Sequence, residues 1–156
     1  MTLQLDLTGR IAFVTGSTRG IGRAIAETLH AAGAQVGVVG RSAATAAEVA
    51  AAIGPRARGF ACDVTQPDSI RAAITACEAE LGPIDILVNN AGITRDNLLI
   101  RLGQAEWDEV LAANLTGAFV ATQAVIKGMM KRRFGRVINI TSVVGVTGNA
   151  GQANYA

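Results

Sequence analysis

The sequence predicts an α/β protein built on one doubly wound parallel sheet. Short apolar runs alternate along the chain with longer segments of helical period, and the 156 residues are 50% hydrophobic but only 4% aromatic. Strands that alternate with helices form parallel sheets covered by helices on both faces. A chain of this length is expected to be one domain, 1–156, that buries roughly two thirds of its unfolded surface.

Five strands are expected, because five short runs are rich in apolar or β-branched residues and are bounded by Gly, Pro or Asp. The predicted strands are Ile11 to Thr15, Gln35 to Val39, Arg58 to Cys62, Ile84 to Val88 and Arg136 to Thr141. The segments between these strands carry the helical pattern.

The first helix is predicted from three apolar residues that recur at helical spacing, namely Ile21, Ile25 and Leu29. Gly33 follows them and is a good residue for the position just after a helix end. The alanine-rich stretch Ala43 to Ala52 is interpreted as a plain second helix.

Two further helices are expected in the second half of the chain. Pro67 opens a helix that runs to about Leu81. The segment Trp107 to Lys131 is different, because its apolar residues cover more than one helical face. A helix of that kind is buried on several sides. One side is expected to lie on the sheet, and the other needs more of the chain or another subunit.

Composition and charge exclude several classes of function. The net charge of +2 is too small to steer a polyanion, and few aromatic side chains are present to stack on bases, so no nucleic-acid partner is expected. No stretch approaches the ~18 apolar residues of a membrane span. The first residues lack the basic and apolar parts of a signal peptide. The chain is therefore expected to be cytoplasmic, with no membrane partner.

The cysteines and the histidine predict no metal site. Cys62 and Cys77 lack CxxC spacing and histidine neighbours, so buried free thiols are the expected state. His30, the only histidine, lies on the first predicted helix and is interpreted as structural. A histidine-based catalytic triad is thereby excluded.

The loop after the first strand has the spacing Gly-x₃-Gly-x-Gly. Glycines in a strand-loop-helix unit allow positive φ and a close approach to pyrophosphate, and the helix N-terminus supplies donors and a favourable dipole. An ordinary structural turn is the alternative for an isolated loop of this kind. The residues predicted to bind a cofactor here are Gly16, Ser17, Thr18, Arg19, Gly20, Ile21 and Gly22.

Two arginines indicate which nucleotide this loop binds. An acid after the second strand would bind a free ribose 2′-hydroxyl, but Arg41 stands there and Arg19 lies in the loop. Two guanidinium groups suit a 2′-phosphate, so NADP(H) is the predicted cofactor. The alternative is that both are solvated surface arginines.

Polar and small residues follow the third and fourth strands. Asp63 and Val64 end the third strand, and Asn90, Ala91 and Gly92 follow the fourth. Open α/β sheets bind ligands at the carboxyl ends of their strands, so these residues are assigned to the cofactor site. Ordinary turn chemistry is the alternative interpretation of both segments.

Taken together, the glycine loop, the Asn-Asn-Ala-Gly turn and separated Asn, Ser and Tyr residues resemble the short-chain dehydrogenase/reductase family over the whole chain. Asn89 to Leu99, Met129 to Arg136 and Ser142 to Ala156 are similar to the bacterial 3-oxoacyl-[acyl-carrier-protein] reductases of fatty-acid synthesis. The resemblance implies a Rossmann-like sheet with strand order 3-2-1-4-5 and without the C-terminal part of the family fold.

The resemblance also implies catalytic roles. Tyr155 would donate a proton to the substrate keto oxygen, Ser142 would hydrogen-bond the same oxygen, and Asn114 would hold a water of the proton relay. Thr141 would lie beside the nicotinamide ring, with Asn90 and Gly92 on the same side. Taken singly, Asn114 suits a helix-interior residue bonded to backbone, Ser142 a strand end, and Tyr155 an amphipathic surface residue.

The resemblance further implies partners. A basic region that receives the acidic carrier protein corresponds to Lys131, Arg132 and Arg133. With Arg136 these residues form a cluster of four cations, which suits an acidic partner. The alternative is that these cations complement the dipole at a helix C-terminus. Family members assemble as tetramers, so a homo-oligomer is expected.

Three functions remain open. The parent protein is predicted to be an NADPH-dependent 3-oxoacyl-[acyl-carrier-protein] reductase. The alternatives are another short-chain NADP-dependent reductase of alcohols and ketones, and a catalytically inactive nucleotide-binding fragment. The resemblance places a lysine four residues after Tyr155, so the chain is expected to be truncated after its catalytic tyrosine and to have weak or no activity alone.

Overall fold

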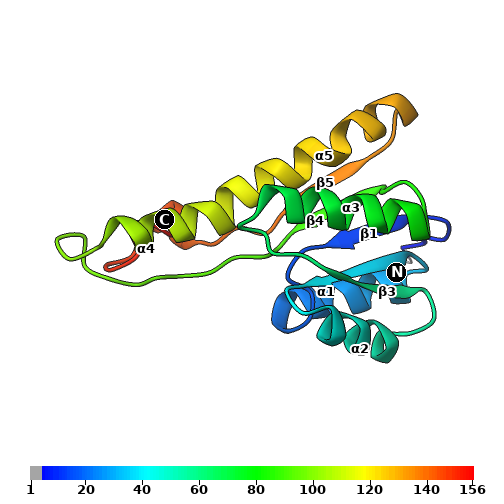
Figure 1. Ribbon diagram of the computed structural model, residues 1–156, viewed down its shortest axis with the longest axis horizontal. Helices are drawn as coiled ribbons and strands as arrows, with labels where there is room; N and C mark the ends of the chain where they lie inside the picture. Colours follow the sequence, from blue (N-terminus) through cyan, green and yellow to red (C-terminus); the bar gives the residue numbers. More distant parts are fainter. Residues whose placement is uncertain (1–4) are drawn as a thin grey trace.

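A five-stranded parallel sheet in the order β3-β2-β1-β4-β5 organises the computed structural model, which describes residues 5–156 (Figure 1). The strands are β1 (Ile11–Val14), β2 (Gln35–Gly40), β3 (Ala57–Ala61), β4 (Ile86–Asn89) and β5 (Arg136–Asn139). The helices are α1 (Gly20–Ala31), α2 (Ala43–Ile53), α3 (Pro67–Leu81), α4 (Gln104–Leu111), a π-helical turn η1 (Ala112–Thr116), α5 (Gly117–Arg132) and α6 (Val144–Thr147). The predicted fold class and strand order are confirmed.

Two strand ends differ from the prediction by two residues, and the others differ by one at most. β4 begins two residues later than expected, at Ile86, because the ladder to β1 begins there. β5 ends at Asn139 and not at Thr141, because its partner strand ends at Asn89, which pairs with Asn139. The chain beyond β5 therefore leaves the sheet two residues earlier.

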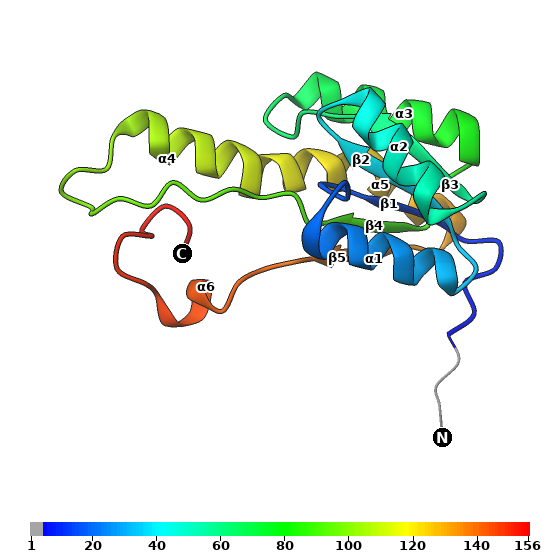
Figure 2. The same ribbon diagram turned by 90° about the horizontal axis from the view of Figure 1, so that it is seen from below.

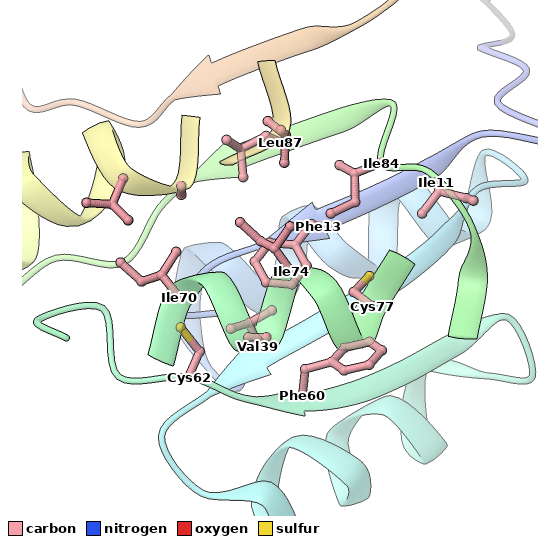
Figure 3. Close-up of a cluster of buried hydrophobic side chains, with 14 of the residues drawn as sticks. Ile11, Phe13, Val39, Phe60, Cys62, Ile70, Ile74, Cys77, Ile84 and Leu87 are labelled. Atoms are coloured by element: carbon pink, nitrogen blue, oxygen red, sulfur yellow. The ribbon is translucent and has the colours of Figure 1, made fainter. Parts of the chain in front are cut away.

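Helices cover both faces of the sheet. α1 and α2 pack on one face, with Ala12 and Val14 of β1 in that cluster. α3 and α5 pack on the other face, with Phe13 and Leu87 from the strands. Figure 3 shows this second cluster, in which strand residues and residues of α3 such as Ile74 point toward one another. The alternation of β1 side chains between two helical layers is what a doubly wound sheet requires.

Both cysteines are buried in the α3 cluster as free thiols, as predicted. Burial raises the pKa of Cys62 to about 11 and that of Cys77 to about 12. No group of metal-ligating side chains occurs among residues 5–156.

The long helix of the second half runs from Gln104 to Arg132 through the π-helical turn. By length and composition it could cross a membrane, so the expectation that no stretch meets this measure was wrong. Its buried residues, such as Val120 and Val125, pack in the cluster with α3 and the sheet, as in a core helix. Its opposite side exposes apolar residues, namely Leu115, Phe119, Ile126 and Met130.

The α4 end of this helix projects beyond the sheet, and the segment that ends at Ala156 lies beside it (Figure 2). The segment between β4 and α4 runs along the same projection. Three parts of the chain that are distant in sequence therefore meet outside the sheet.

Candidate active site

The glycine loop between β1 and α1 is in direct contact with the turn after β4. Gly16 has a φ of +64°, and a Cβ there would lie 2.9 Å from the Cα of Ala91. A Cβ on Gly22 would run into the amide of Asn90 and the carbonyl of Gly16. Only glycine permits this approach, so backbone packing alone requires glycine at both positions.

Asn90 clamps the loop in place. Its Nδ2 donates to the carbonyl oxygens of Thr15, at 2.9 Å, and Gly16, at 3.2 Å. The Thr15 hydroxyl in turn accepts from the N–H groups of Asn90 and Ala91, each at 3.0 Å. The side chain of Asn90 thus holds the loop, and its backbone borders the cleft that follows.

Ser17 is fully buried and ties β1 to β2. Its hydroxyl donates to the carbonyl of Val14 at 2.6 Å and accepts from the N–H of Val39 at 2.8 Å. The N–H of Ser17 donates to the carbonyl of Val39 at 2.9 Å. Both donors of Ser17 therefore serve the fold, and its predicted contact with a cofactor stays a prediction. The first turn of α1, from Gly20 to Gly22, presents the N–H groups that every helix start leaves unpaired.

Arg19 and Arg41 are both exposed at the carboxyl edge of the sheet. Arg19 is the N-cap residue of α1, and Arg41 directly follows β2. Thr18 packs on Gly40, where a Cβ would lie 2.5 Å from its methyl group, so the loop lies against the end of β2. Arg19, in the loop, and Arg41, after β2, therefore belong to segments that lie close together at this edge.

Asp63 is held as a carboxylate after β3. Its Oδ1 accepts from the hydroxyl of Thr65 at 2.7 Å and from the Thr65 N–H at 2.9 Å. These two hydrogen bonds, with a smaller contribution from the charge of Arg41, lower the pKa of Asp63. Asp63 and Arg41 are thus electrostatic neighbours at the edge predicted for the ribose and its phosphate.

Asn114 lies in the π-helical turn and bonds to a distant backbone. Its Oδ1 accepts from the N–H of Ile93 at 2.8 Å, and its Nδ2 donates to the carbonyl of Ile93 at 2.9 Å. Gly92 packs against the same amide. Turns of π-helix inside α-helices are frequent at functional sites. The bonding to backbone expected for an isolated Asn114 is found, but between two separate segments.

A single cleft of about 1040 Å³ brings the predicted catalytic residues together. Ser142 reaches it from the segment after β5, where its hydroxyl accepts from the N–H of Val144 at 3.2 Å. Tyr155 reaches it from the far end of the chain and is half-buried. The predicted site residues that line this cleft are Ile21, Val64, Asn90, Ala91, Gly92, Asn114, Thr141, Ser142 and Tyr155.

Sequence reasoning missed one polar network behind the cleft. The Nδ2 of Asn89 donates to Oδ1 of Asn139 at 2.9 Å and to the hydroxyl of Thr122 at 3.1 Å. These bonds join β4, β5 and α5 where Thr141 and Ser142 leave the sheet. The pairing of Asn89 with Asn139 depends on strand register, which no local pattern in the sequence indicates.

The basic cluster lies at the opposite end of α5 from the cleft. Because α5 has 16 residues at about 1.5 Å each, its ends are about 24 Å apart. Arg132 donates to the carbonyl of Ile84 at 2.6 Å and lies 3.8 Å from the carboxylate of Asp85, so it holds the helix to the start of β4. Lys131, Arg132 and Arg133 are all exposed, and their predicted docking role stays a prediction.

Comparison with known proteins places this geometry in a family. Residues 10–156 match the short chain dehydrogenase family. The 3-oxoacyl-[acyl-carrier-protein] reductase FabG of Vibrio cholerae is 51% identical over 152 residues, and that of Escherichia coli K12 is 50% identical over the same length. Each match covers 97% of this chain and 62% of the relative, so the chain spans less than two thirds of the length of these curated relatives.

A solved structure agrees with these matches. The gluconate 5-dehydrogenase of Burkholderia cenocepacia, in complex with NADP and tartrate, superimposes with a TM-score of 0.92 at 39% sequence identity. The match covers 97% of this chain and 61% of that one. With the glycine loop, the Asn-Asn-Ala-Gly turn and the shared cleft in place, the chain belongs to the short chain dehydrogenase family.

Proposed function

We propose that the native gene product containing this chain reduces the keto group of a 3-oxoacyl thioester on acyl carrier protein, with NADPH as reductant. One observation carries the proposal: a single cleft brings Ile21 of the glycine loop and the turn after β4 together with Asn114, Ser142 and Tyr155. The identity of 50% to 51% with 3-oxoacyl-[acyl-carrier-protein] reductases supports the substrate class.

The cradle at the carboxyl edge fits a dinucleotide phosphate. The loop packs so closely on the turn after β4 that no side chain fits at Gly16 or Gly22. The start of α1 offers free N–H groups for a pyrophosphate. Arg19 and Arg41 supply two exposed cations beside it, which suit a 2′-phosphate. When bound there, the cofactor would supply a hydride to the substrate carbon.

Tyr155 and Ser142 complete the reduction on the oxygen side. We assign to Tyr155 the proton that goes to the keto oxygen while the carbonyl carbon gains the hydride, which yields the 3-hydroxy product. Ser142 donates a hydrogen bond to the same oxygen and stabilises the charge that develops there. Asn114 keeps one amide hydrogen and lone pairs beyond its two bonds to Ile93, so it retains capacity to bind a water.

The carrier-protein partner is assigned to the exposed Lys131 and Arg133. These cations lie at the end of α5 away from the cleft, and we propose that a carrier protein docked on them delivers its acyl group to the cleft of a second subunit. The exposed apolar side of α5, with Phe119 and Met130, is a surface on which that subunit would pack. We therefore propose a homo-oligomer, located in the cytoplasm.

The test is NADPH consumption, followed by its absorbance, with an acetoacetyl thioester as substrate. The proposal expects turnover with the wild-type protein and a loss of roughly 100-fold or more in kcat for Tyr155→Phe, with NADPH affinity retained. Activity on sugar acids or simple alcohols, with none on the thioester, would favour the second candidate, which the likeness to a gluconate 5-dehydrogenase supports. NADPH binding without turnover of any ketone would contradict both.

A further inference from the structure

One short segment holds the side chain of Asn114 and also the stretch of chain that carries Tyr155. This segment, which we call the strap, comprises residues 93–97 between β4 and α4. Its first residue, Ile93, accepts and donates the two hydrogen bonds of Asn114. Its later residues contact the segment that carries Tyr155.

Asn154 makes the buried contact between the strap and the tyrosine segment. Its side chain is only 5% exposed, although asparagine is usually a surface residue. Its Nδ2 donates to the carbonyl of Arg95 at 3.0 Å and, more weakly, to that of Glu106 at 3.4 Å. One amide therefore joins the residue beside Tyr155 to both the strap and α4.

Further bonds make the strap a fixed support. The N–H of Asn97 donates to the carbonyl of Gly151 at 2.8 Å, and Gln152 donates to Asp96 at 3.0 Å. On its other side, Arg95 forms a two-bond ion pair with Glu109 of α4, at 2.6 and 2.8 Å. The strap is thus anchored on α4, and it meets the tyrosine segment with the carbonyl of Arg95, the carboxylate of Asp96 and the N–H of Asn97.

We infer that Asn154 is a positioning residue for Tyr155: it fixes the tyrosine to the strap that also holds Asn114, so that both side chains share one support. The inference rests on the proposed function. Asn154 adjoins Tyr155 directly, so loss of its bonds frees the backbone from which the phenol projects. A misplacement of about 1 Å in a reacting group lowers a rate by about 100-fold.

The test replaces Asn154 with leucine, which has a similar volume but no donor. The exposed Asn149, whose amide bonds only to Gln152 among residues 5–156, gives the matched control Asn149→Leu. Steady-state kinetics of NADPH-dependent ketone reduction are measured for the native gene product. We expect kcat to fall between roughly 10-fold and 100-fold in Asn154→Leu, with the KM for NADPH unchanged and the control unaffected.

Hydrogen exchange gives a second readout that needs no substrate. Peptides that cover 93–97 and 149–156 should both exchange faster in Asn154→Leu, because each segment loses its support. A folded variant with unchanged kcat, or faster exchange in only one of the two peptides, would overturn the inference. If the leucine variant does not fold, Asn154→Ser replaces it, because serine keeps one donor. We expect this variant to lower kcat by a smaller factor and to leave the KM for NADPH unchanged.

The two proposals fail in different ways. A wild-type protein that reduces no ketone contradicts the proposed function, and the exchange experiment then still tests the shared support. An active wild type whose Asn154→Leu variant matches Asn149→Leu contradicts the positioning role alone.

Discussion

The interior strands β1 and β2 and the edge strand β5 differ in how completely they are covered. In β1 all four residues are buried, and in β2 all but the first are, because helices pack on both faces. In β5 only Val137 is half-buried, and the strand forms an open edge within residues 5–156. The glycine loop and Arg41 are built on the covered strands, whereas Ser142 follows the open one. The residues proposed to bind the nucleotide and the Ser142 proposed to hydrogen-bond the keto oxygen therefore have separate structural supports.

The largest effect is expected from a substitution in the glycine loop, which follows the covered strand β1 and contacts the turn after β4. Gly22→Val places a side chain where the amide of Asn90 and the carbonyl of Gly16 already lie. Either the loop or the turn must move, so we expect NADPH affinity to fall by more than about 100-fold, which corresponds to about 2.7 kcal/mol. Calorimetric titration measures this.

Gly128→Ala is the matched control, because a Cβ there meets only the flexible end of Arg132 in an α-helix. It should leave affinity unchanged and increase stability by about 0.5 to 1 kcal/mol. Equal affinities of Gly22→Val and the control would show that the close packing of loop and turn does not matter for the nucleotide.

The next largest effect comes from a valine-to-alanine substitution, which we compare between the covered strand β2 and the open strand β5. Val38→Ala removes a side chain of β2 that is 0% exposed, and we expect it to cost about 2 to 3 kcal/mol in the free energy of unfolding. Val137→Ala, in the half-buried position of β5, should cost about 1 kcal/mol. Urea unfolding of both variants measures the difference, and equal costs would remove the distinction between the covered interior strands and the open edge strand.

The smallest effect at neutral pH concerns the buried thiols. Burial raises the pKa of Cys62 to about 11 and that of Cys77 to about 12, so both remain protonated in the folded protein at pH 8. Iodoacetamide should therefore modify them slowly until the protein unfolds.

The raised pKa values of the two thiols also determine how the stability of the protein changes with pH. Thiols of the unfolded chain lose protons near pH 8.5, below the folded values, so the native state keeps more protons above that pH. Stability should then fall as pH rises from about 8.5 toward 11. Rapid labelling at pH 8, or stability that rises above pH 9, would contradict the burial of these groups.

Local signals predicted some elements to the residue. α3 runs from Pro67 to Leu81 as expected, because proline suits the first helical position and Gly82 follows with a φ of +107°. Gly33, expected just after the first helix, has a φ of +103°. In both cases the residue type itself constrains the backbone.

The remaining features depend on contacts between distant segments. The π-helical turn at Asn114 accompanies bonds to Ile93 and close packing of Gly117 on the carbonyl of Val64. Arg132 is typical of a helix C-terminus, but its partner Asp85 is fixed only by the fold. Asn154 gives no periodic signal, because it lies in a turn-rich stretch of small and polar residues.

Our central claim is that the glycine loop and the exposed arginines of the covered region hold a nucleotide that carries a 2′-phosphate. Calorimetric titration of the native gene product and its Arg41→Asp variant with NADPH and NADH tests it most directly. We predict that the wild type binds NADPH at least about tenfold more tightly than NADH, a difference of about 1.4 kcal/mol, and that the variant loses this preference. No heat with NADPH, or equal affinity for both nucleotides in the wild type, would contradict it.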